Sequence, residues 1–279
     1  MSLFKGKATN IAVIQYRIMQ DDMEDNLQKV ATLITAAKSK GANFICLPAN
    51  FATGINFPSL RQNSQSLHDI QSFLSKQALE HEIQICAGVL EWNGGDIYDS
   101  AILIGSDGQL LAKYRRASLW EDERDFISQG KACDVIDTPL GRIGLLVSYD
   151  IRFPESSRHY FQQEVDILVC VANLFTRYSF PVETLCRARA ADNGCCVVFA
   201  SGLGNNRLAM MDYMGRSMIV DGLCEAISDD NRCDILAQAG QEESTITAIW
   251  YPRQQRKVRL KQPYLHDYIR MSSIKHGEG

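Results

Sequence analysis

Short, continuously apolar segments constrain the fold of this chain more than any other feature of its sequence. The clearest is residues 43–48, NFICLP, which is rich in strand-forming residues and much shorter than a buried helix. A strand without polar alternation indicates burial on both faces, as in a sheet that is covered by helices. A second apolar run, at residues 165–172, predicts another strand.

Amphipathic helices and turn signals separate the strands. In residues 22–40 apolar side chains recur at helical spacing, with Asp21 or Asp22 as the N-cap and Gly41 after the last turn. Further helices are predicted at residues 66–81, 154–163 and 181–193. Further strands are predicted at residues 10–16, 84–91, 97–105, 109–115, 133–137, 142–148, 195–201, 215–221, 233–239 and 244–251. Helices alternate with strands early and hairpins follow, which predicts helices packed on sheets that are not purely parallel.

The chain has no Pro/Gly/Ser-rich linker, internal repeat or low-complexity segment. We therefore interpret its 279 residues as a single domain, with a core at about residues 9–252 and a C-terminal tail at about residues 253–279. The tail begins with a basic run at residues 253–261. We interpret this run as a solvated face or a subunit contact rather than as a polyanion site.

Composition argues against several classes of partner. The chain has 29 Lys and Arg against 33 Asp and Glu, a net charge of −4, so we expect no nucleic-acid partner. No apolar run approaches about 18 residues, and residues 1–14 lack the apolar core of a signal peptide. We therefore expect no membrane partner and a cytoplasmic location. The nine cysteines form no C-x-x-C pair and no zinc-type cluster, so we expect buried, reduced thiols and no bound metal.

Four segments, in order along the chain, resemble the nitrilase (carbon–nitrogen hydrolase) superfamily. They are FICLPANFATG (residues 44–54), IYDSAILIGSDGQLLAKYRRASL (97–119), TPLGRIGLLVSYDIRFPE (138–155), and DILVCVANLF with ETLCRARAADNGCCVVFAS (within 166–201), followed by GRSMIVD (215–221). The most specific is YDIRFPE after an apolar strand. Among the branches of the superfamily, the sequence looks most like the Nit/ω-amidase type.

The resemblance implies a fold, an assembly and a chemistry. The fold is a four-layer αββα sandwich with a pocket between strand ends. The assembly is a homodimer or a larger homo-oligomer, and association with an active homologue is a further expectation. Members hydrolyse nitriles, amides or carbamoyl groups without a metal or cofactor, which implies a small amide or carboxylate as ligand.

The family's catalytic Glu–Lys–Cys triad is substituted at all three matched positions. Ala49 occupies the position of the glutamate that acts as base, Arg116 that of the lysine, and Ser148 that of the cysteine nucleophile. A methyl group cannot accept a proton, and arginine keeps the charge but does not lose its proton. A serine without a base is a poor nucleophile. We expect turnover by the family's route to be slower by about 10⁴ or more.

Other residues at the expected pocket keep a possible function open. Glu123 matches the family's second glutamate and could pair with Arg116 or replace the missing base. Glu183 is placed by resemblance toward the pocket, and the backbone N–H of Tyr149 corresponds to an oxyanion donor. Asp150, beside Ser148, is expected to hold the turn. The five histidines lie outside the matched motifs and are expected at the surface: His68, His81, His159, His266 and His276.

Two classes of function follow. The first is a protein that has lost amidase or nitrilase activity and that binds a small carboxylate or amide near Arg116, or serves as a scaffold or partner subunit. The second is an active hydrolase of small amides that uses Ser148, or water with Glu123, by altered chemistry. An enzyme would place the Ser148 hydroxyl within reach of a base, a binding protein would have an open cavity, and a scaffold would have a filled one.

Overall fold

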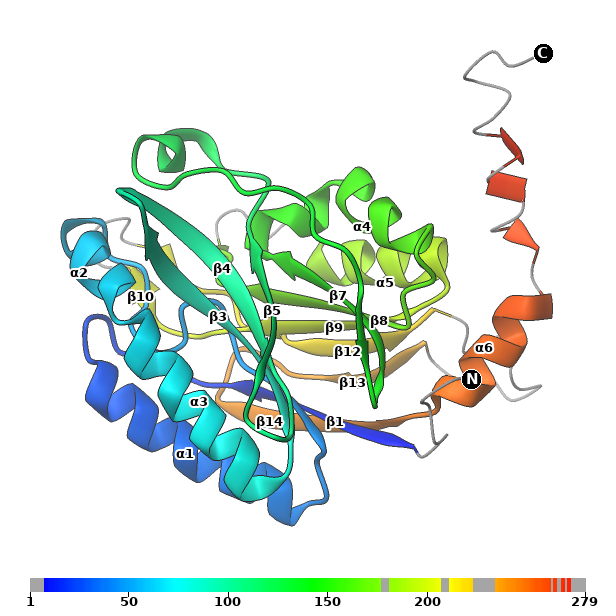
Figure 1. Ribbon diagram of the computed structural model, residues 1–279, viewed down its shortest axis with the longest axis horizontal. Coiled ribbons are helices and arrows are strands. Elements are labelled where there is room, and N and C mark those ends of the chain that lie inside the picture. The colour runs from blue at the N-terminus through cyan, green and yellow to red at the C-terminus, as the bar shows by residue number, and fades with distance from the viewer. Residues whose placement is uncertain are drawn as a thin grey trace.

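Two six-stranded sheets lie face to face at the centre of the protein, as the computed structural model shows (Figure 1). The structure describes residues 8–176, 181–206, 211–222 and 234–261, together with residues 263, 264, 267, 268, 270 and 271. Both sheets are mixed, as the sequence predicts.

The first sheet combines a parallel centre with antiparallel edges. Its order is β14 (Ser244–Trp250), β1 (Thr9–Gln15), β2 (Phe44–Cys46), β3 (Gln84–Asn93), β4 (Asp96–Ile104) and β5 (Leu110–Arg115). Strands β1, β2 and β3 are parallel, whereas β14, β4 and β5 pair antiparallel with their neighbours. Strand β3 thus lies parallel beside β2, and the antiparallel strands β4 and β5 complete the sheet.

The second sheet follows the same plan. Its order is β13 (Ile235–Gln238), β12 (Met218–Asp221), β9 (Cys196–Ser201), β8 (Ile167–Ala172), β7 (Gly141–Val147) and β6 (Ile136–Thr138). Strands β7, β8 and β9 are parallel, and the outer strands are antiparallel. A short separate ladder joins β10 (Asn205–Asn206) to β11 (Met211–Asp212). The carboxyl ends of β7 and β8 therefore meet at one edge, where the segments that follow them can build a site.

Helices cover the outer face of each sheet. Helices α1 (Met23–Ser39) and α3 (Leu67–His81) pack on the first sheet, and α4 (Pro154–Phe161) and α5 (Val182–Asn193) pack on the second (Figure 1). Alternate residues of one strand serve different layers: Ile11 faces the other sheet, whereas Ala12 faces the helices. The expected four-layer αββα sandwich is confirmed.

The ends of α1 show how local sequence sets the boundaries of an element. The Asp22 carboxylate accepts a hydrogen bond from the Asp25 backbone N–H at 3.2 Å and caps the helix. Gly41 follows the last turn with a φ of 88°, a conformation that glycine adopts without strain. Both ends of α1 therefore lie where the sequence predicts them.

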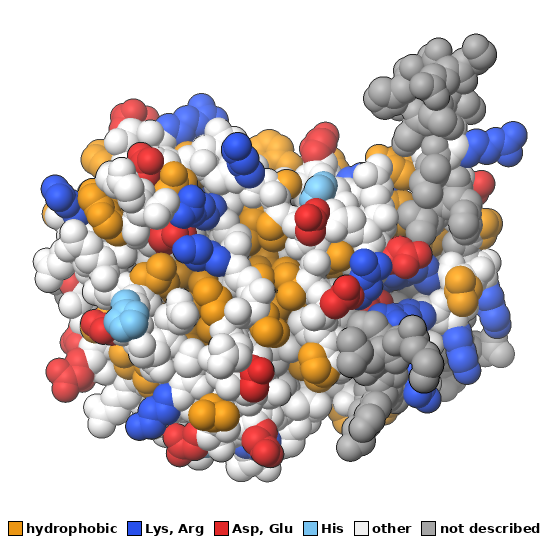
Figure 2. Space-filling view, in the orientation of Figure 1, with side chains coloured by type: hydrophobic (Ala, Val, Ile, Leu, Met, Phe, Trp, Pro, Cys, Tyr) orange, Lys and Arg blue, Asp and Glu red, His pale blue; other side chains and the backbone are white. Residues whose placement is uncertain are grey.

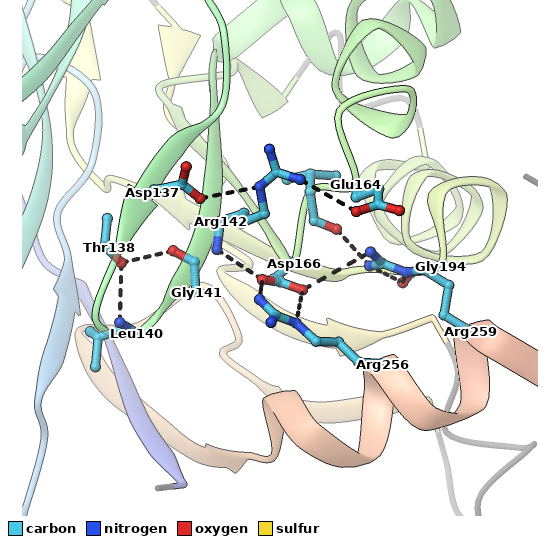
Figure 3. A network of polar contacts seen from close by, with 11 residues as sticks. Asp137, Thr138, Leu140, Gly141, Arg142, Glu164, Asp166, Gly194, Arg256 and Arg259 are labelled. Atoms are coloured by element: carbon cyan, nitrogen blue, oxygen red, sulfur yellow. Dashed lines mark hydrogen bonds and ion pairs between the residues drawn. The ribbon is translucent and has the colours of Figure 1, made fainter. Parts of the chain in front are cut away.

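The basic run at the start of the expected tail forms a helix, α6 (Pro252–Lys261), rather than an unstructured extension. Two of its arginines turn inward (Figure 3): Arg256 makes a bidentate pair with the buried Asp166 carboxylate, and Arg259 donates to the carbonyl oxygens of Val165 and Gly194. The interpretation of the run as a solvated face was wrong for these two residues. The other cations of α6 remain exposed, and blue side chains gather over this helix in Figure 2.

The described cysteines and histidines lie where their sequence context indicates. Cys46, Cys86, Cys170, Cys186, Cys195 and Cys196 are free and buried, and Cys133 is free and partly buried. His68 is exposed, and His81 and His159 are partly exposed. Cys224, Cys233, His266 and His276 lie outside the described residues. Within the described part of the chain, no helix is long and apolar enough to span a bilayer.

Candidate functional site

A tight turn at the end of β7 places Ser148 at the edge of the second sheet. Ser148 starts a short 3-10 helix, η3 (Ser148–Arg152), and has a φ of 45°. A non-glycine residue with positive φ is uncommon and costs conformational energy. The backbone N–H of Tyr149 lies in the first turn of η3, where N–H groups have no acceptor within the helix.

Asp150 holds this turn by three hydrogen bonds. Its carboxylate accepts from the backbone N–H of Val147 (3.1 Å) and of Ser118 (2.8 Å) and from the Tyr114 hydroxyl (2.7 Å). Burial raises the pKa of Asp150, although these donors lower it in part. The contacts agree with the structural role that we expect for Asp150. On the other side, Arg189 of α5 donates to two carbonyl oxygens of η3.

A cavity of about 270 Å³ opens beside the turn. Its walls come from five stretches of chain: the segment before α2 (Leu60–Gln65), the end of β5, the 3-10 helix η2 (Glu121–Asp125) with the residue before it, η3, and the residues after β8. The described lining residues are Ile55, Phe57, Arg116, Trp120, Glu121, Asp122, Glu123, Ser148, Tyr149, Arg152, Asn173, Leu174 and Phe175. The cavity thus brings together Arg116, Glu123, Ser148 and Tyr149, four residues that the sequence singles out.

Arg116 lies at the inner wall between two carboxylates. Its side chain is almost fully buried, with Nη1 3.3 Å from Asp99 Oδ2 and Nη2 2.7 Å from Glu123 Oε2. The same Glu123 oxygen accepts from the Trp120 backbone N–H at 2.9 Å. Arg116 Nε is buried and has no hydrogen-bond partner among the described residues. Lys113 pairs with Glu91 and takes no part in this network.

The charged groups around Arg116 shift one another's pKa values. The pKa of Asp99 is raised to about 6: burial is the main cause, the nearby Arg116 works against it, and the Glu123 charge adds to it. Burial also works to lower the pKa of Arg116, but the carboxylates of Asp99, Glu123 and Asp150 outweigh burial and raise it. Arg116 is therefore a permanent cation in an environment with an excess of acidic groups.

No base among the described residues contacts the Ser148 hydroxyl. Among the described residues its one hydrogen-bond partner is the Asn173 backbone N–H, which donates to Ser148 Oγ at 3.3 Å. Asn173 also donates from its side chain to the Ala49 carbonyl oxygen and accepts from the Gly202 N–H at 3.2 Å. Asn173 therefore fixes the hydroxyl relative to both sheets, but it offers no group that could accept the hydroxyl proton.

Ala49, which the sequence resemblance matches to the family's base, is fully buried in the apolar cluster between the sheets. It is not among the described residues that line the cavity. Glu183 also lies elsewhere. It is a half-exposed residue in the first turn of α5, it contacts Arg187 and Gln238, and it borders a separate depression with Met214 and Arg216. The placement of Glu183 toward the pocket, which the resemblance implies, is not what the structure has.

Sequence reasoning missed several residues of the site. Asp99 carries a signal in hindsight, because it is a charged residue inside a strand, next to the run of apolar residues that ends β4. Asn173 is the first polar residue after the apolar β8, at the strand end where sites are built. The aromatic wall carries no sequence signal, because Phe57, Trp120 and Phe175 come from segments far apart in the chain. Among the described residues, no group of three or more His, Cys, Asp or Glu could hold a metal ion.

The fold and the site agree with a known family. The sequence pattern of the family Carbon-nitrogen hydrolase matches residues 10–249, and this chain belongs to that family. It is 30% identical to Omega-amidase NIT2 from Bos taurus over 253 residues, which cover 85% of this chain and 87% of the relative. It is 29% identical to Deaminated glutathione amidase from Synechocystis sp. over 268 residues, with 89% and 94% coverage.

Solved structures give the same result. Nit3 from Saccharomyces cerevisiae, described as a member of branch 10 of the nitrilase superfamily, superposes with a TM-score of 0.82 at 25% identity and covers 94% of this chain and 97% of its own. A carbon–nitrogen hydrolase from Helicobacter pylori has a TM-score of 0.83 at 20% identity, with 94% and 95% coverage. Together with the sequence relatives, Nit3 places the chain in the Nit-type branch of the superfamily, and the Helicobacter pylori structure supports the fold.

Proposed function

We propose that this protein has lost amide and nitrile hydrolysis and that it uses the family pocket to bind a small amide or carboxylate. The observation that carries the proposal is the isolation of the Ser148 hydroxyl. Asn173 N–H is its hydrogen-bond partner, and the carboxylates of Asp99 and Glu123 are paired with Arg116 instead. A serine needs an adjacent base to attack an amide carbonyl.

The open cavity supports binding over a purely structural role. A scaffold has no need for a cavity of about 270 Å³, and side chains from the surrounding segments could have filled it. The cavity keeps polar groups beside apolar walls, the usual composition of a small-molecule site.

One observation favours a second candidate, an amidase with altered chemistry. Glu123 lines the cavity, and its side chain is 21% exposed, so it can reach a bound water molecule. Its pairing with Arg116 argues against it, because a carboxylate bound to a cation is a weak base. The experiment below separates the two candidates.

The test is ammonia release from a panel of small amides and nitriles. The wild-type protein is compared with Ser148→Ala and with a triple variant, Ala49→Glu/Arg116→Lys/Ser148→Cys. A silent wild type and an active triple variant are the expected result, since the pocket would then survive without its chemistry. Wild-type turnover that disappears in Ser148→Ala would contradict the proposal and point to serine-based catalysis. Turnover that persists in Ser148→Ala but not in Glu123→Gln would identify the water route.

The family resemblance also leads us to propose a cytoplasmic location and assembly as a homodimer or larger homo-oligomer. Light scattering coupled to size-exclusion chromatography tests the assembly, and a monomer at micromolar concentration would contradict it. Mixing with an active family member before chromatography tests whether the two associate.

A further inference from the structure

We infer that the ligand of this pocket is a small primary amide whose outer end carries a cationic group, an ammonium or a guanidinium. The inference rests on the proposed function, because it names the ligand class of the same pocket. Three features carry it: hydrogen-bond donors at the inner end, the pairing of both Nη atoms of Arg116 with carboxylates, and an aromatic and acidic outer wall.

The inner end of the pocket offers hydrogen-bond donors. Arg116 Nε has no acceptor among the described residues, but the atom is fully buried, so the donors that a ligand can reach are others. The Tyr149 N–H, in the first turn of η3, and the Ser148 hydroxyl are donors at the same end. A carbonyl oxygen is the group that complements these donors, and an amide supplies one.

A ligand carboxylate fits the inner end poorly. The two Nη atoms of Arg116 already contact Asp99 and Glu123, and the Asp150 charge also acts on this guanidinium. A carboxylate would add a further anion to a buried group of acids that surround one cation. Desolvating that charge would cost more than hydrogen bonds from the Tyr149 N–H and the Ser148 hydroxyl could return. A neutral carbonyl makes the same hydrogen bonds without this penalty.

The outer wall of the cavity favours a positively charged group of the ligand. Glu121 and Asp122 of η2 line the cavity, and both are exposed at its mouth. The rings of Trp120 and Tyr149 stand beside them in an edge-to-face pair, with centroids 5.0 Å apart. Aromatic faces next to carboxylates attract ammonium and guanidinium groups.

The guanidinium of Arg152 already contacts this wall. The Arg152 guanidinium lies 5.9 Å from the centre of the Tyr149 ring, which is the geometry of a cation–π contact. Arg152 also reduces the negative charge of the cavity, but the described lining contains three carboxylates against two guanidinium groups. Because Glu123 and Asp99 are paired with Arg116, the charge that the described residues present to a ligand at the mouth is that of Glu121 and Asp122, opposed by Arg152.

The experiment is titration calorimetry of the full-length protein with three probes of equal chain length. Butyramide is neutral, 4-aminobutanamide has an ammonium at the outer end, and succinamate has a carboxylate there. We expect 4-aminobutanamide to bind at least about tenfold more tightly than butyramide, and succinamate to bind most weakly. The double variant Glu121→Gln/Asp122→Asn should lose this preference and keep its affinity for butyramide. The matched control is Asp69→Asn/Glu80→Gln, two exposed acids of α3 that should leave all three affinities unchanged.

Tighter binding of succinamate than of 4-aminobutanamide would overturn the inference, as would a cation preference that survives in Glu121→Gln/Asp122→Asn. No detectable binding of any probe would overturn both the inference and the proposed function. Ammonia release from 4-aminobutanamide by the wild-type protein would contradict the proposed loss of activity alone. In that case the charge preference among the probes would still stand.

Discussion

Arg116 and Glu123 form a short ion pair, with 2.7 Å between Nη2 and Oε2, at the inner wall of the cavity. The pair joins the end of β5 to η2 and orders the segment that carries the acidic mouth of the pocket. Asp99 approaches the same guanidinium from the neighbouring strand β4. An arginine at this position has a structural consequence: Arg116 bridges two carboxylates at once through its fork of donors.

Removing the charge of Arg116 should destabilise the protein strongly. Arg116→Met leaves Asp99 and Glu123 without their shared cation, and breaking a buried pair from one side typically costs about 3–5 kcal/mol. The Glu123 end is partly exposed, so the lower part of this range is expected. Urea unfolding of Arg116→Met measures the loss. Arg116→Lys keeps the positive charge and is the control. It should lose less than half as much free energy of unfolding as Arg116→Met. Equal stability of wild type and Arg116→Met would refute the assignment of a structural role.

Asp99→Asn should stabilise the protein at alkaline pH. Burial is the main cause that raises the pKa of Asp99 to about 6, above its value of about 4 in an unfolded chain. The folded state then binds this proton more tightly than the unfolded state, so the ionised group costs stability above about pH 6. That cost fades as the pH falls toward about 4. The asparagine keeps an oxygen that can accept from Arg116 and removes the charge.

The measurement is the free energy of unfolding of wild type and Asp99→Asn at pH 8 and at pH 4.5. We expect the variant to be more stable by about 1–3 kcal/mol at pH 8 and by about a third of that margin at pH 4.5. Asp125→Asn, at an exposed position of η2, controls for the general loss of a charge. A variant less stable than wild type at pH 8 would mean that attraction to Arg116 outweighs burial.

The backbone at Ser148 stores strain that a pair of substitutions can isolate. Ser148→Gly and Ser148→Ala both remove the hydroxyl, but only glycine adopts a φ of 45° without steric cost. Ser148→Gly should therefore be more stable than Ser148→Ala by about 1 kcal/mol, as measured by denaturant unfolding. Gly and Ala variants of equal stability would show that the turn relaxes when the hydroxyl is lost.

Much of the fold could be predicted from the sequence, because local patterns determine it. The apolar run of β2 has no polar alternation and proves to be covered on both faces, and Asp22 and Gly41 bound α1 as their residue types indicate. The helix α6 could not be predicted this way. Its sequence is largely polar, and what holds its Arg256 is the buried Asp166, which lies 90 positions earlier in the chain.

Only the site residues that lie in matched motifs could be predicted from the sequence. Arg116, Glu123 and Ser148 follow from matched segments and do meet at one cavity. Asp99 and Asn173 control the charge of Arg116 and the position of Ser148, but both effects depend on contacts across strands and sheets that no local pattern encodes. The resemblance predicts substitutions at the triad positions, whereas the pairing that leaves Ser148 without a base among the described residues becomes visible only in three dimensions.

The C-terminal helix should depend on one buried carboxylate. Asp166 is 1% exposed, Arg256 binds both of its oxygens, and the Arg142 backbone N–H donates to it at 2.9 Å. Arg256→Ala should lower the free energy of unfolding by about 1–3 kcal/mol and speed proteolysis within α6, because the buried charge loses its main partner. Arg256 is itself about one-third exposed, and this solvent screening keeps the estimate below that for a fully buried pair. Arg253→Ala, at an exposed position of the same helix, should change neither readout. If Arg253→Ala and Arg256→Ala behaved alike, α6 would be held by packing rather than by Asp166.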